Sequence, residues 1–353
     1  MFRFVVHRLI SSIPVLFGIV VAVFFLVRVI SGDPCRAQLG ERATDEICDQ
    51  FTKDLGLDRA IPVQFARYLG DLFTGDFGNS LQQRRAVSTI LIERLPTTIE
   101  LAVLALFFAI LIGVPLGVIA AYKRNSAADV GTMIVANAGV SVPVFVLGLV
   151  VQYLFAVTLK DSFISLPPSG RLSPGLVPEP FYETWGLGKN GVFDFISNFE
   201  VLNALLQWNW RIVVDAAQHL ILPAIVVGTI PLAIIARMTR ASLVDVLGQD
   251  YVRTARAKGF KELVVVRRHA LRSALLPVVT VVGLSLGSLF GGAILTESVF
   301  GLAGVGKTLS DSIYARDYSV VQGFALIVGI GFVIVNLVTD LMYTVFDPRV
   351  RVN

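Results

Sequence analysis

Long apolar runs alternate with polar segments along the whole chain. A helix rises about 1.5 Å per residue, so roughly 20 apolar residues are enough to cross the hydrocarbon core of a bilayer. The pattern therefore predicts six membrane-spanning helices, at about Leu9–Ile30, Thr97–Tyr122, Val130–Leu159, Ile212–Ile235, Leu275–Leu295 and Val320–Phe346. A cleaved signal peptide would share the basic start and apolar core of the first run. That run is longer than a signal core and no A-x-A-like site follows it, so we expect a retained span.

The first polar segment, residues 31–95, reads as a helical insertion. It carries ten acidic and eight basic residues, and short amphipathic stretches in it are punctuated by Gly56, Pro62 and Gly75. Cys35 and Cys48 lie near its start. An oxidising exterior would permit a disulfide between them, while two free thiols remain the alternative.

One polar segment between two spans is strongly basic. Residues 237–272 hold nine basic and three acidic residues, a net charge of +6 against +4 for the whole chain. Inside it, Gln249–Pro277 predicts a helix over Tyr251–Lys258, an interruption at Gly259 and a second helix over Phe260–Leu271. A short helix, a glycine and a short helix between two spans are typical of a docking element.

The distribution of charge predicts the orientation. The chain start, Lys123 and Arg124, the 237–272 segment and the tail are basic, whereas the other loops are acidic or balanced. Positive loops stay in the cytoplasm, so we expect cytoplasmic termini and an extracytoplasmic insertion at residues 31–95. The domain organisation is then residues 1–30, the insertion, a core of residues 96–346 with the coupling loop at 237–272, and a tail at 347–353.

Composition excludes several classes of function. Hydrophobic residues make up 55% of the chain, charged residues 16%, and mean hydropathy is +0.73, which is unlike a soluble domain. The loop charges account for the basic pI, so no nucleic-acid partner is expected. His7, His219 and His269 are scattered, and no nucleophile, base or metal ligands converge, so we expect neither a metal nor a catalytic site.

Gly301–Thr308 reads GLAGVGKT, a formal match to the phosphate-binding G-x-x-x-x-G-K-[ST] loop. Such a loop needs a preceding strand, a following helix and a sheet carrying a magnesium-binding Asp. The short linker between the last two apolar runs cannot hold that fold. We interpret the match as spurious and expect no nucleotide or other cofactor in this chain.

Several longer motifs carry a family resemblance. DYVRTARAKGF with RRHALRSALLPVVT resembles the cytoplasmic EAA-type loop of ABC importer permeases, and specifically the first permease of the dipeptide/oligopeptide family. LGLDRAIPVQFARYLGDLFTGDFGNS, ERLPTTIELA, SVPVF, GGAILTESVF, ARDYSVVQG and NLVTDLMYTVFDPRVR are similar to that family too, so the resemblance covers nearly the whole chain. The chain departs from the usual pattern in three places. The EAA positions are Arg253, Thr254 and Ala255, and the usual Leu-Pro pair lies further from Gly259, at Leu276–Pro277. Ala303 stands where the family usually has proline.

The resemblance implies an all-α integral membrane protein with the six-helix architecture of a type I ABC importer permease, in the bacterial inner membrane. The implied partners are a second permease, two cytoplasmic ATPases that bind ATP and Mg, an extracytoplasmic binding protein and membrane lipid. The implied substrates are short peptides. Import of nickel complexes or glutathione by the same machinery remains the alternative, and a stand-alone channel a more remote one.

Two sets of site residues follow. The loop residues expected to couple to the ATPases are Tyr251, Arg253, Thr254, Ala255, Arg256, Ala257, Lys258, Gly259 and Arg268, with Tyr251, Ala255 and Lys258 sharing one helical face toward the partner. Polar residues inside spans are costly and often functional. The candidates for a translocation path are Glu100, Asn137, Ser141, Gln152 and Asn336, whereas Asp340 is expected to pair with an arginine of the basic loop.

Overall fold

The structure, a computed structural model, describes residues 2–29, 35, 36, 43–54 and 56–346. Within these residues the regular structure is helical, with a single isolated bridge between Asn79 and Ala86. The long helices are α1 (Phe2–Val29), α5 (Val87–Tyr122), α6 (Ala127–Ser141), α11 (Trp210–Leu247), α14 (Leu271–Gly292) and α17 (Tyr318–Phe346).

Shorter helices connect the long ones. They are α3 (Asp45–Asp54), α4 (Ile61–Phe73), α7 (Val144–Tyr153), η1 (Leu154–Thr158), α8 (Phe181–Thr184), α9 (Gly191–Ser197), α10 (Glu200–Leu206), α12 (Asp250–Ala257), α13 (Glu262–Val264), η2 (Val265–Ala270), α15 (Ile294–Val299) and α16 (Val305–Tyr314). The amphipathic helices predicted for the insertion are present as α3 and α4. The linker between α7 and α11, which we expected to be a loop, contains α8, α9 and α10.

Five helices of the described chain are long and apolar enough to cross a membrane, and there are six if one bent pair counts as a single span. The bent pair is Ala127–Ser141 with Val144–Thr158, whose axes meet at 97°. The third predicted span, Val130–Leu159, is therefore two helices that meet at a sharp bend. The bend has a local cause, because Val142 precedes Pro143 and takes an extended conformation (φ −101°, ψ 133°), as residues before proline prefer.

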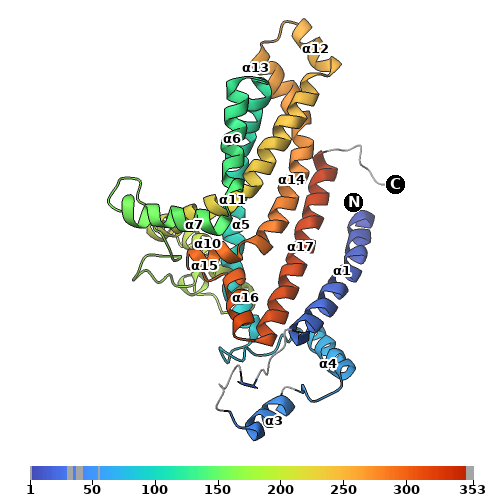
Figure 1. Cartoon of the computed structure of the whole chain (residues 1–353), viewed down its shortest axis with the longest axis vertical. Helices are drawn as coiled ribbons and strands as arrows, with labels where there is room; N and C mark the ends of the chain where they lie inside the picture. The colour runs from blue at the N-terminus through green and yellow to red at the C-terminus, as the bar shows by residue number, and fades with distance from the viewer. Residues whose placement is uncertain (1, 30–34, 37–42, 55, 347–353) are drawn as a thin grey trace.

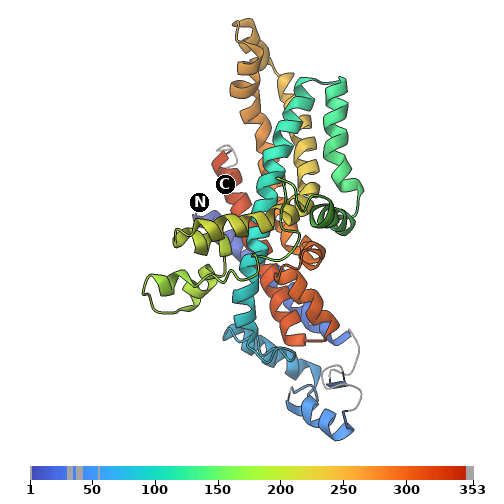
Figure 2. The same cartoon turned by 90° about the vertical axis from the view of Figure 1, so that its left-hand side faces the viewer.

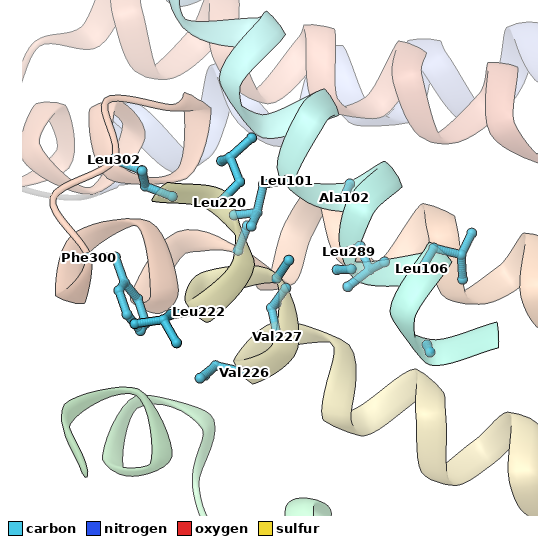
Figure 3. Packing of buried hydrophobic residues seen from close by; sticks show 14 of the residues in the cluster. Leu101, Ala102, Leu106, Leu220, Leu222, Val226, Val227, Leu289, Phe300 and Leu302 are labelled. Atoms are coloured by element: carbon cyan, nitrogen blue, oxygen red, sulfur yellow. The ribbon is translucent and has the colours of Figure 1, made fainter. Parts of the chain in front are cut away.

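Helices α5 and α11 form the centre of the molecule. Gly113 and Gly117 lie one turn apart on α5, and a Cβ on Gly117 would stand 2.6 Å from the carbonyl oxygen of Ala236 on α11. Small residues spaced in this way let two membrane helices approach closely. Figure 3 shows Leu101 of α5 beside Leu220 and Val227 of α11, and all three side chains are buried.

The two ends of the molecule differ in what they carry. Figure 1 shows α12 and α13 at one end, beyond the ends of α1 and α17, and α3 and α4 at the other. At that second end Cys35 and Cys48 form a disulfide. In Figure 2 the amino-terminal part of α11 runs crosswise before the helix turns toward α12.

Two predicted boundaries need correction. α5 begins at Val87, ten residues before the predicted start of the second span, because residues 87–96 also pack as helix. Arg237 and Arg240 were assigned to the coupling loop, but both lie inside α11, which continues to Leu247.

Candidate coupling surface and translocation path

The candidate docking element begins with α12 and a glycine stop. Gly259 has φ +81°, a conformation that costs other residues steric strain. Its N–H donates to the carbonyl of Arg256 (2.9 Å), and the N–H of Phe260 donates to that of Ala255 (3.4 Å). These are the two bonds of a Schellman cap, so the glycine ends α12 and reverses the chain.

The inner face of this element packs on the chain itself. Val252 and Ala255 of α12 are buried with Val265 and Val266 of η2 and Leu243 of α11. The expectation that Ala255 shares an outward face with Tyr251 and Lys258 is therefore wrong: Ala255 is 6% exposed, whereas the other two are exposed. Its small side chain lets α12 lie close to η2 and α11.

Arg256 also acts within the element. Its guanidinium donates to both carboxylate oxygens of Glu262, at 2.7 and 3.1 Å, and to the carbonyl of Leu247. The arginine thus joins α12, α13 and the end of α11. Its hydrogen bond to Glu262 is the main reason that the pKa of Arg256 is raised.

The outer face combines apolar and basic side chains. Tyr251, Phe260, Leu263 and Val264 are exposed although they are large and apolar. Basic or polar exposed residues surround them, and these are Arg253, Thr254, Lys258, Lys261, Arg267 and Arg268, with Ala257 also exposed. An exposed apolar patch with a polar rim is typical of a protein-binding surface. Our prediction missed Phe260, Leu263 and Val264, although their i, i+3, i+4 spacing marks one helical face.

The docking element continues directly into α14 through η2. This segment is a π-helix over Val265–Ala270, a form that occurs in short pieces and is frequent at functional sites. Val265, Val266 and Ala270 are buried in it. Continuous helix therefore joins α13 to the membrane-spanning helix α14.

Two predicted path residues, Asn137 and Ser141, line one groove with a volume of about 570 Å³. The groove runs along α6, and its wall on the α11 side includes Arg240, which donates to both oxygens of Asp129 at 2.6 and 2.7 Å. Arg237 lies one turn before Arg240 and donates to the amide oxygen of Asn137. Sequence reasoning missed Arg237 because we counted it as a loop charge.

The other predicted path residues are separated from this groove. Glu100 pairs with Arg171 and accepts from the backbone of Val201. Gln152 donates to the carbonyls of Pro168 and Val299 and so joins two segments. These contacts stabilise the fold.

The last two intramembrane polar residues lie on α17. Asn336 is half-buried. Asp340 pairs with Arg8 of α1 at 3.2 Å, not with an arginine of the basic loop. α1 and α17 pack together, and this brings the two charges into contact.

The segment Gly301–Thr308, which matches the phosphate-binding loop motif, folds around the carboxylate of Glu297. Glu297 is fully buried, and it accepts from the N–H of Lys307 (2.9 Å) and the hydroxyl of Thr98 (2.6 Å). Thr98 in turn accepts from the N–H of Val305 (2.8 Å). A Cβ on Gly304 would lie 2.4 Å from the Glu297 carboxylate, so the glycine leaves room for the acid.

Family models match nearly all of the chain. Residues 113–352 match the binding-protein-dependent transport system inner membrane component, and residues 1–102 match the amino-terminal region of such membrane components. The chain belongs to this family. Its members are membrane subunits of binding-protein-dependent transport systems, so this chain is a multi-pass inner-membrane protein with the all-α permease fold.

Full-length relatives support the same assignment. The chain is 42% identical over 351 residues to the dipeptide transport system permease protein DppB of Alkalihalophilus pseudofirmus, covering 99% of this chain and 100% of that protein. It is 44% identical over 352 residues to the di/tripeptide transport system permease protein DppB of Pseudomonas aeruginosa, covering 99% of each. The glutathione transport system permease protein GsiC of Escherichia coli is 36% identical over 351 residues, again with 99% of each chain covered.

Proposed function

We propose that the chain is one permease subunit of an ATP-driven, binding-protein-dependent importer of dipeptides and short oligopeptides. The observation that carries this proposal is identity above 40% along the full length to relatives named as dipeptide or di/tripeptide permeases. A second permease, two cytoplasmic ATPases that bind ATP and Mg, and an extracytoplasmic binding protein complete the transporter. The chain itself contributes half of the path and no catalytic group.

In this proposal α12, Gly259 and α13 dock on an ATPase. The exposed Phe260 and Leu263 supply apolar contact area, and the surrounding Lys258, Lys261 and Arg268 select an acidic rim on the partner. The buried inner face makes the element a rigid unit. When the ATPases close, this unit moves and transmits the motion through η2 to α14.

The difference between the two ends of the molecule supports the orientation that we propose. The basic docking element faces the cytoplasm, as the positive-inside rule requires. The insertion then faces the exterior, where the Cys35–Cys48 disulfide is stable against reduction. Asn137 and Ser141 line the path in this proposal. Arg240 lies in the wall of the same groove and Arg237 donates to Asn137, and an arginine on a membrane-spanning helix needs water or a polar partner.

The direct test is uptake by the complete transporter. The complex that co-purifies with this chain is reconstituted with its binding protein in proteoliposomes, and import of labelled dialanine is measured with and without ATP. ATP-dependent import is expected. Import of glutathione without dialanine would favour the second candidate, for which the 36% identity to a glutathione permease is the supporting observation. ATP-independent flux would contradict both.

A further inference from the structure

The motif Glu93–Ala102, ERLPTTIELA, contains one polar side chain that the fold does not use. Glu93 pairs with Arg85 at the surface. Thr97 and Glu100 bind Arg171, and Thr98 binds Glu297. Arg94 alone among the charged and hydroxyl-bearing residues of the motif has no hydrogen-bond or ion-pair partner in the described part of the chain, and its Nε is buried.

Arg94 lines a polar cleft of about 650 Å³. The cleft lies between α5, the 80–85 loop and α16. Its lining includes the side chains of Gln82 and Gln83 from the loop, and of Lys307, Asp311 and Tyr314 from α16. Lys307 and Asp311 pair with each other at 2.6 Å, which leaves the Arg94 guanidinium as the cation without a counterion in this lining.

The loop that carries Gln82 and Gln83 is held in place by hydrogen bonds to Ser80 and Asp317. Ser80 and Asp317 are almost completely buried, and the Ser80 hydroxyl donates to the Asp317 carboxylate at 2.5 Å. The N–H of Gln82 donates to the same carboxylate, and the N–H of Gln83 to the Ser80 hydroxyl. These bonds fix the backbone of Gln82 and Gln83 beside the cleft.

The backbone is strained near both residues of the Ser80–Asp317 hydrogen bond. Arg84 has φ +52° and Arg316 has φ +54°, in the left-handed region that residues with a side chain rarely adopt. Such strain is retained where the surrounding structure over-determines the conformation, and it clusters at binding and active sites. Here it sets the shape of the cleft's loop wall and the end of α16.

We propose that this cleft binds a short peptide through its terminal carboxylate, with Arg94 as the anchoring cation. A guanidinium presents a planar fork of donors that matches the two oxygens of a carboxylate. The neighbouring Gln82 and Gln83 offer both donors and acceptors for a peptide bond. Asp311 supplies an acid on the same lining, and the largely exposed Tyr314 offers an apolar surface at the rim. The cleft has room for a dipeptide.

This inference rests on the proposed function, and it adds a substrate site on the permease itself. α16 and the 80–85 loop lie away from the docking element, on the side of the molecule that we assign to the exterior. The cleft would hold the peptide after the binding protein releases it. Few side chains of the cleft would contact the peptide, and several of them are exposed to solvent. Binding would therefore be weak, as a site that must release its ligand into the translocation path requires.

The test measures peptide binding without the binding protein. The co-purified transporter complex is placed in nanodiscs and titrated with dialanine and with alanyl-alaninamide, which lacks the carboxylate. Charge-assisted hydrogen bonds contribute enough that we expect Arg94→Gln to weaken dialanine binding by about tenfold or more, and the amide to bind the wild type equally weakly. Arg94→Lys should recover part of the affinity. Arg59→Gln, which removes an exposed arginine of the insertion that does not line the cleft, should leave the affinity unchanged.

Several results would overturn the proposal. These are equal dialanine binding by wild type and Arg94→Gln, equal binding of dialanine and its amide, or no saturable binding to a complex that imports peptide. Normal dialanine binding by Arg94→Gln, together with weaker binding of the binding protein, would show that Arg94 pairs with an acidic side chain of the binding protein and not with the peptide. Recovery of the intact complex checks folding. Failure of dialanine import by the wild type would contradict the proposed function alone, since the Arg94-dependent binding is measured separately.

Discussion

The hydroxyl of Thr98 on α5 donates to the buried carboxylate of Glu297, 199 residues further along the chain, and accepts from the N–H of Val305. One small side chain thus joins α5, α15 and the start of α16. The glycine-rich segment that resembles a nucleotide loop is shaped by this contact.

Replacement of Thr98 by Val keeps the shape and removes both bonds. A buried carboxylate oxygen and a buried N–H then lose their partner, and each loss costs about 1–3 kcal/mol. We expect a clear drop in the thermal midpoint of the solubilised complex. Thr132→Val is the matched control, because that hydroxyl donates only to carbonyls of its own helix. Equal midpoints for the two variants would contradict the role of Thr98.

The contact between α5 and α11 depends on Gly117. An added methyl would stand 2.6 Å from the Ala236 carbonyl oxygen, which is backbone and cannot move aside. We therefore expect Gly117→Ala to destabilise the complex by about 1–3 kcal/mol, as overpacking does. Gly131→Ala on α6, with no atom within 4 Å of the new methyl, should be tolerated. Thermal unfolding compares the two, and a stable Gly117→Ala variant would show that the helices are less closely packed.

Glu200 on α10 predicts a dependence of stability on pH. Burial raises the pKa of this carboxyl above its ordinary value of 4.5, against the attraction of Arg171, and its Oε2 has no hydrogen-bond partner. The folded state therefore binds the proton more tightly than the unfolded state. The associated stability is present at low pH and is lost as pH rises through the folded-state pKa.

Glu200→Gln stays neutral at every pH and should escape this loss. The thermal midpoint of the variant minus that of the wild type should grow as pH rises from acid to mildly alkaline. The exposed Glu183→Gln serves as the control and should show a constant difference. A constant difference for Glu200→Gln would argue against the burial effect.

The path assignment can be tested with single cysteines. Both cysteines of the chain are in the disulfide, so an introduced cysteine is the one free thiol. Asn137→Cys should react quickly with a membrane-impermeant thiol reagent in at least one of two states, nucleotide-free or ATP-trapped. Ala136→Cys, at a neighbouring position that is 1% exposed, should react slowly in both. Protection of Asn137→Cys in both states would exclude a water-filled path there.

Much of the fold was predictable from local patterns. Apolar runs located the five helices that are long and apolar enough to cross a membrane, and also the bent pair Ala127–Ser141 with Val144–Thr158. Gly259 was correctly identified as the point where α12 ends, because the signals that stop a helix are local. Boundaries failed where helices continue through polar residues, as at Val87 and Leu247. The third predicted span is broken at Pro143, whereas Pro115, also inside a predicted span, leaves α5 unbroken, and the sequence alone does not distinguish the two cases.

Side-chain partners were less predictable, because they come from distant segments. Ala255 was expected to face outward, yet α11 and η2 cover it. Asp340 was expected to meet a loop arginine, but α1 lies beside α17 and brings Arg8. The contact of Arg237 with Asn137 joins positions a hundred residues apart, and no local pattern indicates it.

The coupling claim is tested most directly at Gly259, in proteoliposomes that contain the complete transporter and its binding protein. A side chain at φ +81° costs about 1–2 kcal/mol for most residues, whereas Asn tolerates this conformation. A Cβ there meets no atom within 4 Å, so strain alone would act. We predict that Gly259→Val inserts and co-purifies with its ATPases but loses peptide-stimulated ATP hydrolysis and dialanine import, while Gly259→Asn retains both. Normal import by Gly259→Val would contradict the account.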